Sequence, residues 1–323
     1  MPTNIEYALM AGASYISTRW EINQFPVPDG WLESIEDRQT KPSGFEATYF
    51  TKGAEIVISY SGTDPENWNP LTTPDGMTNS NLSAGKWADQ LMQAAEYYLN
   101  IRATHSGPIT LTGHSLGGGL AALVGVFFGV RATTFDQAPF AASAQLQHPD
   151  GNWRSNAEDL LARLSTKYDP ETLAGLTEYV RLLNVDIFSS VIPRAELVNT
   201  IRVKGEFLDG GFLGSDPIGN SADLLTHGPG GNGEQLHSQA LLSAFLQSDA
   251  TAPAVGQQKQ SLSEVSKKLT DLLTMIFDKS LYDRGTGRSN STDVNFLEYD
   301  SVNETLHQWL LREHPQDLRA LRV

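Results

Sequence analysis

The residues best suited to chemistry are Gly113-His114-Ser115-Leu116-Gly117, in which a serine has a glycine two positions before it and another two positions after it. A serine hydroxyl becomes a nucleophile when a sharp turn exposes it and a nearby base takes its proton. The glycines leave room for backbone that larger side chains would block. The spacing therefore indicates a nucleophilic Ser115, provided that a strand precedes it and a helix follows it.

The flanking sequence predicts both of these elements. Ile109 to Leu111 is an apolar, β-branched run entered from Gly107-Pro108, which is typical of a buried strand. From Leu120 to Val130 the chain is apolar over about three helical turns, too few to span a membrane. Strand, turn and helix in this order predict the nucleophile elbow of an α/β-hydrolase, with Ser115 at a helix N-terminus that favours negative charge.

An earlier strand indicates where the transition state would be stabilised. The stretch Glu55 to Tyr60 predicts a strand paired in a hairpin with Gly44 to Phe50, and it runs directly into Ser61-Gly62-Thr63. In this fold the oxyanion hole takes one N–H from the residue after the nucleophile and another from the loop after such a strand. We therefore expect the N–H groups of Leu116 and Thr63 to form it.

The general base must be a histidine that follows the serine in the chain. Five histidines qualify: His148, His227, His237, His307 and His314. The first falls in an insertion and the last two lie beyond a linker, so we interpret these three as surface residues. Of the two that flank the glycine-rich stretch 228–233, we prefer His237, because it stands between this loop and the start of an apolar helix and would be well held.

The acid of the triad follows a strand in this fold, and three carboxylates are candidates. Glu206 comes just after the strand predicted at 198–203, which we take as the last strand of the sheet. Asp209 lies three residues further along the same loop, and Asp186 stands between two apolar runs. Glu206 is preferred, with Asp209 and Asp186 as alternatives, because only geometry can decide among them.

The remaining elements follow from apolar periodicity. A further strand is predicted at 132–135, and helices at 5–18, 87–101, 156–168 and 170–182. Together they predict an α/β-hydrolase with a mostly parallel central sheet. Residues 64–86 look like a long polar loop that carries Trp68, Leu71 and Met77, and 141–181 like a helical insertion, and either is a candidate lid over Ser115.

The low-complexity stretch Ser248 to Gln260, rich in Ala, Pro, Gln and Ser, predicts a linker. We therefore expect residues 1–248 to form the hydrolase domain and 249–323 to form a linker and a helical C-terminal extension.

Charge and composition restrict the possible partners. A formal net charge of −15 argues against nucleic acid and against attraction to anionic membranes, although transient contact with a lipid interface is compatible with it. The chain has no cysteine, and residues 1–4 show no sign of a signal peptide. The composition fits a cytoplasmic protein or one exported without such a signal, with no stable membrane insertion. No cofactor or metal is expected.

Several segments resemble a known family. The sequences ISYSGT (58–63) and LTGHSLGG (111–118) are similar to class 3 lipases. Further segments resemble a bacterial branch found in large secreted multidomain proteins: YALMAGASY (7–15), TFDQAPF (134–140), VKGEFL (203–208) and LHSQALL (236–242). The resemblance implies a serine lipase or esterase. Class 3 lipases usually have arginine where Ser61 stands and aspartate as the acid, so Ser61 and Glu206 would be departures.

These features predict a serine hydrolase that cleaves carboxylic esters, with acylglycerols or similar lipids as substrates. A phospholipase or a thioesterase would use the same residues and differ only in the pocket. A hydrolase fold retained for binding alone is a further alternative, which the intact serine, histidine and oxyanion loop disfavour.

Overall fold

The computed structural model describes residues 1–16, 25, 27–63, 72–145, 155–185, 191–203, 205–206, 208, 215–224, 237, 239, 242–243 and 246. Their centre is an eight-stranded sheet in the order β1-β3-β4-β5-β6-β7-β8, with β2 paired to β3. The strands are β1 (Leu32–Glu33), β2 (Gln39–Thr40), β3 (Glu46–Lys52), β4 (Glu55–Tyr60), β5 (Ile109–His114), β6 (Ala132–Phe135), β7 (Val198–Val203) and β8 (Asn220–Leu224). Strands β4 to β8 are mutually parallel, and β1, β2 and β4 pair with β3 antiparallel. The predicted mostly parallel sheet is confirmed.

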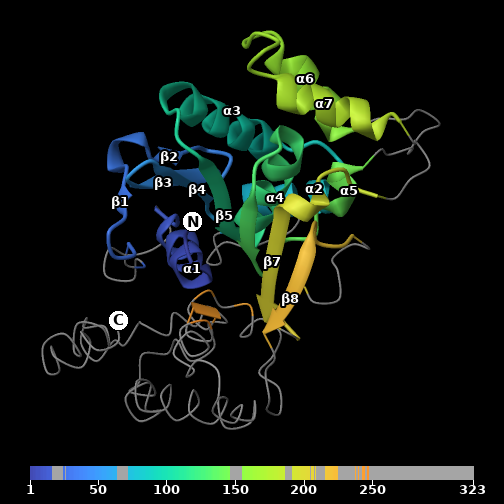
Figure 1. Cartoon of the computed structure of the whole chain (residues 1–323). Coiled ribbons are helices and arrows are strands. Elements are labelled where there is room, and N and C mark those ends of the chain that lie inside the picture. Colours follow the sequence, from blue (N-terminus) through green and yellow to red (C-terminus); the bar gives the residue numbers. More distant parts are fainter. Residues whose placement is uncertain are drawn as a thin grey trace, which may run out of the picture.

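Helices cover both faces of the sheet, because its central strands are apolar on both sides (Figure 1). On one face α4 (Leu116–Phe128) packs on β5 and β6, and α3 (Asp89–Thr104) and α7 (Ala174–Leu183) pack on α4. On the other face α1 (Asn4–Ala13) lies against β5. Strand β4 shows the alternation: Ile56 and Ile58 join the core on the α4 side, whereas Val57 joins the core on the α1 side.

The smaller elements complete the α4 side and the connections. They are η2 (Ile35–Asp37), α2 (Pro74–Ser83), α5 (Ala141–Ala144), α6 (Asn156–Leu164) and η4 (Ala195–Leu197). Buried leucines of α6 and α7, among them Leu160 and Leu176, belong to the same apolar core as α4. The apolar faces of these two helices therefore serve the core of the domain.

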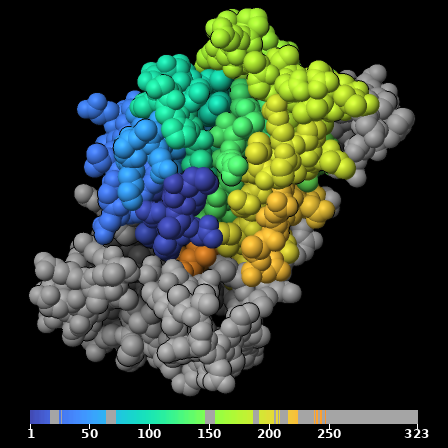
Figure 2. Space-filling model, viewed as in Figure 1, coloured from blue at the N-terminus to red at the C-terminus, as the bar shows by residue number. Residues whose placement is uncertain are grey.

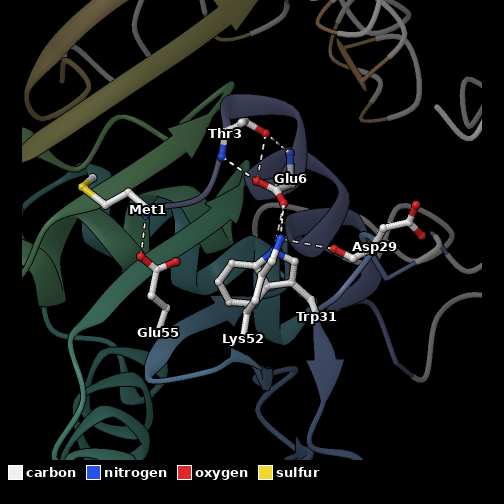
Figure 3. A network of polar contacts seen from close by, with 7 residues as sticks. All are labelled: Met1, Thr3, Glu6, Asp29, Trp31, Lys52 and Glu55. Carbon is white, nitrogen blue, oxygen red and sulfur yellow. Dashed lines mark hydrogen bonds and ion pairs between the residues drawn. The ribbon is translucent and has the colours of Figure 1, made fainter.

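Polar contacts fix the N-terminal helix to the sheet (Figure 3). Thr3 and Glu6 form a capping box at the start of α1, and Glu6 Oε1 also accepts from Trp31 Nε1 at 3.0 Å. Lys52 Nζ, at the end of β3, lies 3.2 Å from the same carboxylate oxygen. Figure 2 shows α1 in dark blue between the blue N-terminal strands and the yellow-to-orange residues of β7 and β8.

Two expectations about local structure are wrong. The loop expected over 64–86 contains helix α2, which Thr73 caps by accepting from the N–H of Gly76. Its polar sequence conceals the helix, since Leu82 is the one large apolar residue that α2 buries. The strand at 198–203 is not the last one either, because β8 extends the sheet beside it. The β8 segment is short and polar, and it lacks the alternation of apolar and polar residues by which a strand is recognised in a sequence.

The expected boundary at 248/249 and the predicted extension 249–323 lie outside the described residues. Within the described part of the chain, no helix combines the length and apolar character that crossing a bilayer requires.

Candidate active site

Ser115 occupies a strained turn between β5 and α4. Its φ of 55° and ψ of −125° lie in a region that residues with a side chain seldom adopt. The neighbours enforce this turn: the Ser115 N–H donates to the carbonyl of Phe135 at 3.0 Å, and the Ser115 carbonyl accepts from Ala138 at 2.9 Å. A Cβ on Gly117 would lie 2.1 Å from the Tyr60 carbonyl oxygen, so this position requires glycine. The turn has the geometry expected of a nucleophile elbow.

The structure brings Ser115, His237 and Glu206 together in one chain of hydrogen bonds. Ser115 Oγ lies 2.8 Å from His237 Nε2, and His237 Nδ1 lies 2.6 Å from Glu206 Oε2. Because a carboxylate only accepts, a neutral His237 carries its proton on Nδ1 and leaves Nε2 to accept from the serine hydroxyl. The arrangement can therefore remove the proton of Ser115.

Two short segments hold the histidine and the carboxylate. Glu206 follows β7 in a turn closed by its own N–H donating to the Val203 carbonyl, and its Oε2 also accepts from the Leu208 N–H at 2.7 Å. The carboxylate is almost fully buried, with 2% of its side chain exposed. After His237, Gln239 donates to the Ala8 carbonyl of α1 at 2.7 Å. Glu206 is thus fixed at the end of β7, and the segment that follows His237 is fixed to α1.

The predicted alternatives Asp209, Asp186 and His227 lie outside the described residues.

Leu116 and Thr63, the expected oxyanion donors, lie on the two segments that meet at the elbow. Leu116 is the first residue of α4, where N–H groups have no intrahelical acceptor. Thr63 lies in the loop after β4, and its Oγ1 accepts from Asn79 Nδ2 of α2 at 2.8 Å. A Cβ on Gly62 would lie 2.8 Å from the His114 carbonyl oxygen, so this loop presses against the elbow. Helix α2, absent from the sequence-based prediction, therefore supports the loop.

The lid candidates remain predictions. Trp68 and Leu71 lie outside the described residues, whereas Met77 on α2 is 48% exposed.

Sequence reasoning assigned no role to three residues packed behind the elbow: Tyr15, His114 and Asp136. The Tyr15 hydroxyl lies 3.1 Å from His114 Nδ1, and His114 Nε2 lies 3.7 Å from Asp136 Oδ2. The rings of His114 and His237 are 4.8 Å apart between centroids. The only signals in the sequence were the place of His114 inside the motif and that of Asp136 at a strand end, where functional residues of parallel sheets gather.

His114, Asp136 and His237 also form a group that could hold a metal ion, with ligand atoms within 4.8 Å of one another. Both ring nitrogens of His237 already contact Ser115 or Glu206, so a metal bound there would compete with the serine–histidine contact.

Comparison with known proteins finds similarity to phospholipases and to a lipase. A family model described as a Tle-like phospholipase domain matches residues 25–162. An extracellular phospholipase A1 of Serratia liquefaciens is 31% identical over 96 residues, and the match spans 30% of this chain and 28% of that protein. The crystal structure of the Lip2 lipase from Yarrowia lipolytica has 13% sequence identity and a TM-score of 0.36, covering 70% of this chain and 78% of that one.

The placement of the chain in a bacterial secreted branch stays a prediction. The mostly parallel sheet and the strained serine turn have the arrangement of an α/β-hydrolase fold, and both sequence matches are similarities to phospholipases over part of the chain.

Proposed function

We propose that this enzyme cleaves carboxylic esters of lipids through a catalytic triad of Ser115, His237 and Glu206. The observation that carries the proposal is the continuous contact from Ser115 Oγ through both nitrogens of His237 to the buried Glu206. A serine hydroxyl is a weak nucleophile until a base removes its proton. A serine that transfers acyl groups therefore requires such a chain of hydrogen bonds, whereas an ordinary surface serine does not.

In the first half of the reaction, Ser115 Oγ attacks the ester carbonyl while its proton passes to His237 Nε2. The carbonyl oxygen becomes an oxyanion, which accepts from the N–H groups of Leu116 and Thr63. Glu206 stabilises the imidazolium that forms on His237. The tetrahedral intermediate then breaks its bond to the leaving alcohol, which takes the proton from Nε2, and the acyl group stays on Ser115.

In the second half, a water molecule attacks the acyl carbon and gives a proton to His237 Nε2. The bond between the acyl carbon and Ser115 Oγ breaks, and the proton returns to the serine oxygen. The products are a fatty acid and the free enzyme, and no step requires a cofactor.

Phospholipids are the substrate class with the most support, ahead of acylglycerols. The matched family is described as phospholipase-like, and the Serratia liquefaciens relative is named a phospholipase A1. We therefore propose hydrolysis of a glycerophospholipid ester, with simple esters as accessory substrates. A thioesterase activity on the same residues remains the alternative.

The test uses the full chain with three substrate sets: nitrophenyl esters of rising acyl length, an acyl thioester, and phosphatidylcholine with different acyl chains at its two glycerol positions. We expect release of fatty acid from phosphatidylcholine, and the identity of that acid reports the position cleaved. Ser115→Ala should abolish every activity while the protein stays folded. Activity retained by folded Ser115→Ala would exclude the triad, and cleavage of the thioester alone would exclude the lipid ester as substrate.

A further inference from the structure

The oxyanion loop Ser61-Gly62-Thr63 follows β4, and backbone contacts hold its first two residues. The Ser61 N–H donates to the Glu46 carbonyl at 3.1 Å, which continues the pairing of β3 with β4. Gly62 has no space for a side chain, because a Cβ there would lie 2.8 Å from the His114 carbonyl oxygen. As far as Gly62, the main chain itself fixes the loop against the elbow.

Thr63 differs from these two residues, because a side chain of another element holds it. Its Oγ1 accepts from Nδ2 of Asn79 on α2 at 2.8 Å, and this is the one hydrogen bond that Thr63 makes among the described residues. The Thr63 N–H therefore meets no acceptor in the described part of the chain. An oxyanion donor requires such an N–H, since a bond already made would have to break before the oxyanion could accept from it.

Helix α2 is anchored near both ends, so it presents Asn79 from a fixed position. Near its start, Asp75 Oδ1 accepts from Gln90 Nε2 of α3 at 2.6 Å, and both side chains are buried. Near its end, the Leu82 carbonyl accepts from Ser143 Oγ of α5 at 2.6 Å. Catalysis benefits from placement by a rigid element, because a displacement of about 1 Å can cost about 10²-fold in rate.

We propose that Asn79 is a positioning residue for the oxyanion hole. By donating to the Thr63 side chain, it holds the Thr63 N–H where the charged oxygen of the tetrahedral intermediate develops, and it leaves that N–H available. This inference rests on the proposed function, because the oxyanion arises in the ester hydrolysis described there. It connects the reaction to α2, a helix that contributes no residue to the triad.

The effect of Asn79 should fall on the transition states rather than on substrate binding. The carbonyl oxygen of the bound ester is neutral, whereas in both tetrahedral intermediates it carries a negative charge. A displaced Thr63 N–H therefore raises the barriers of acylation and deacylation alike, while the ester binds nearly as before. We expect a lower kcat and a nearly constant KM, whichever of the two steps limits the rate.

The first test compares two asparagines of α2. Asn79→Ala should lower kcat for a nitrophenyl ester about tenfold, less than the loss of about 10²- to 10³-fold that removing an oxyanion donor itself causes. Asn81→Ala is the matched control, because this half-buried side chain on the same helix makes no hydrogen bond among the described residues. It should leave kcat unchanged. Equal kcat values in the two variants would overturn the proposal.

The second test asks whether Asn79 acts through Thr63. Thr63→Val keeps the main-chain N–H and removes the oxygen that accepts from Asn79, so this variant alone should lower kcat about tenfold. Asn79→Ala should then cause almost no additional loss in the Thr63→Val background, whereas in a Thr63→Ser background, which keeps the acceptor, it should still cost about tenfold. An undiminished loss in the Thr63→Val background would show that Asn79 acts by another route and would refute the proposal.

An alkyl trifluoromethyl ketone separates oxyanion stabilisation from general damage. Ser115 Oγ adds to the ketone carbon, the serine proton passes to His237, and the former carbonyl oxygen takes the negative charge. The inhibition constant for Asn79→Ala should rise about tenfold, in step with the fall in kcat/KM. A lowered kcat with an unchanged inhibition constant would contradict the proposal, because a purely structural role would give that result.

Failure of this inference can be distinguished from failure of the proposed function. Loss of activity in Ser115→Ala together with a wild-type kcat in Asn79→Ala would leave the triad intact and remove only the role of Asn79. Retained activity in folded Ser115→Ala would instead remove the proposed function and this inference with it. Thermal unfolding of each variant verifies the fold, and Thr63→Val tests the same contact if Asn79→Ala does not fold.

Discussion

Two histidine–carboxylate pairs, an outer pair of His237 and Glu206 and an inner pair of His114 and Asp136, lie next to each other near the carboxyl ends of the parallel strands. They differ in what the second nitrogen of each histidine ring contacts. His237 bonds to Glu206 at 2.6 Å and presents its other nitrogen to Ser115. His114 faces Asp136 at 3.7 Å and presents its other nitrogen to Tyr15. The same two chemical groups thus occupy an outer position suited to proton transfer and an inner position suited to support.

Burial follows the same division. The His237 side chain is 18% exposed, enough to meet a substrate, whereas that of His114 is 6% exposed and Asp136 is fully enclosed. A proton can be exchanged with a reacting ester only from the outer pair. The comparison teaches that the same two chemical groups serve different purposes according to whether a substrate can reach them.

The largest difference between the pairs should come from removing the outer histidine. His237→Ala should lower kcat by about 10⁴-fold or more, and the double variant with Ser115→Ala should be no worse, because the two groups act as one unit. Ester hydrolysis with a phospholipid or a nitrophenyl ester measures this, and thermal unfolding verifies the fold. Losses of kcat that add up in the double variant would show that Ser115 and His237 act independently.

Neutralising the two carboxylates should sharpen the contrast. Glu206→Gln should lower kcat by about 10³- to 10⁴-fold, because an amide can hold the histidine in the wrong tautomer and stabilises its charge poorly. The inner Asp136→Asn is expected to cost only about tenfold, because Asp136 is enclosed and asparagine keeps an oxygen for the Val203 N–H. Steady-state kinetics of the two variants at the same pH compare them directly, and equal losses would show that the pairs do not have separate roles.

Removing the tyrosine hydroxyl that contacts His114 should have a smaller effect on kcat. Tyr15→Phe deletes the hydroxyl next to His114 Nδ1 and should lower kcat by about fivefold, corresponding to a lost hydrogen bond of about 1 kcal/mol. Tyr7→Phe is the matched control, since this tyrosine lies in α1 and its hydroxyl contacts Thr110 instead. A larger loss of kcat in the control would contradict the role of Tyr15.

The smallest effect should come from a carboxylate remote from both pairs. Burial raises the pKa of Glu6, but hydrogen bonds from Thr3, Trp31 and Lys52 outweigh it and hold the pKa below its usual 4.5. The charged form therefore stabilises the fold at neutral pH, and this contribution is lost as the pH falls below 4.5. Glu6→Gln should cost about 1 kcal/mol of unfolding free energy at neutral pH, less in acid, and leave kcat unchanged.

Denaturant unfolding at neutral and acidic pH measures this prediction. Thr3→Ala removes the helix cap without changing the charge, so it separates the effect of the cap from that of the carboxylate. The loss of unfolding free energy in Thr3→Ala should change less with pH than the loss in Glu6→Gln. Identical pH dependence in both variants would contradict the assignment to Glu6.

The sequence was most informative where chemistry depends on local pattern. Glycine spacing and the strand before it predicted the turn at Ser115, and the position after a strand end singled out Glu206, which the structure places 2.6 Å from His237. Those features depend on a few adjacent residues and on the general arrangement of parallel sheets.

The inner pair was not predictable in the same way. His114 and Asp136 are 22 positions apart, and they meet only because β5 and β6 pair in the observed register. Helix α2 and strand β8 were also missed, because polar segments become ordered here through tertiary contacts such as Asn79 with Thr63 rather than through their own periodicity.

The central claim is that Ser115 is a nucleophile activated by His237, and reaction with an alkyl fluorophosphonate tests it most directly. The serine oxygen should form a bond to phosphorus, fluoride should leave, and His237 should take the serine proton. Mass spectrometry should find one phosphonyl group per chain, attached to Ser115, with labelling abolished in His237→Ala. A label on another residue, or equally rapid labelling of Ser115 without the histidine, would contradict the account.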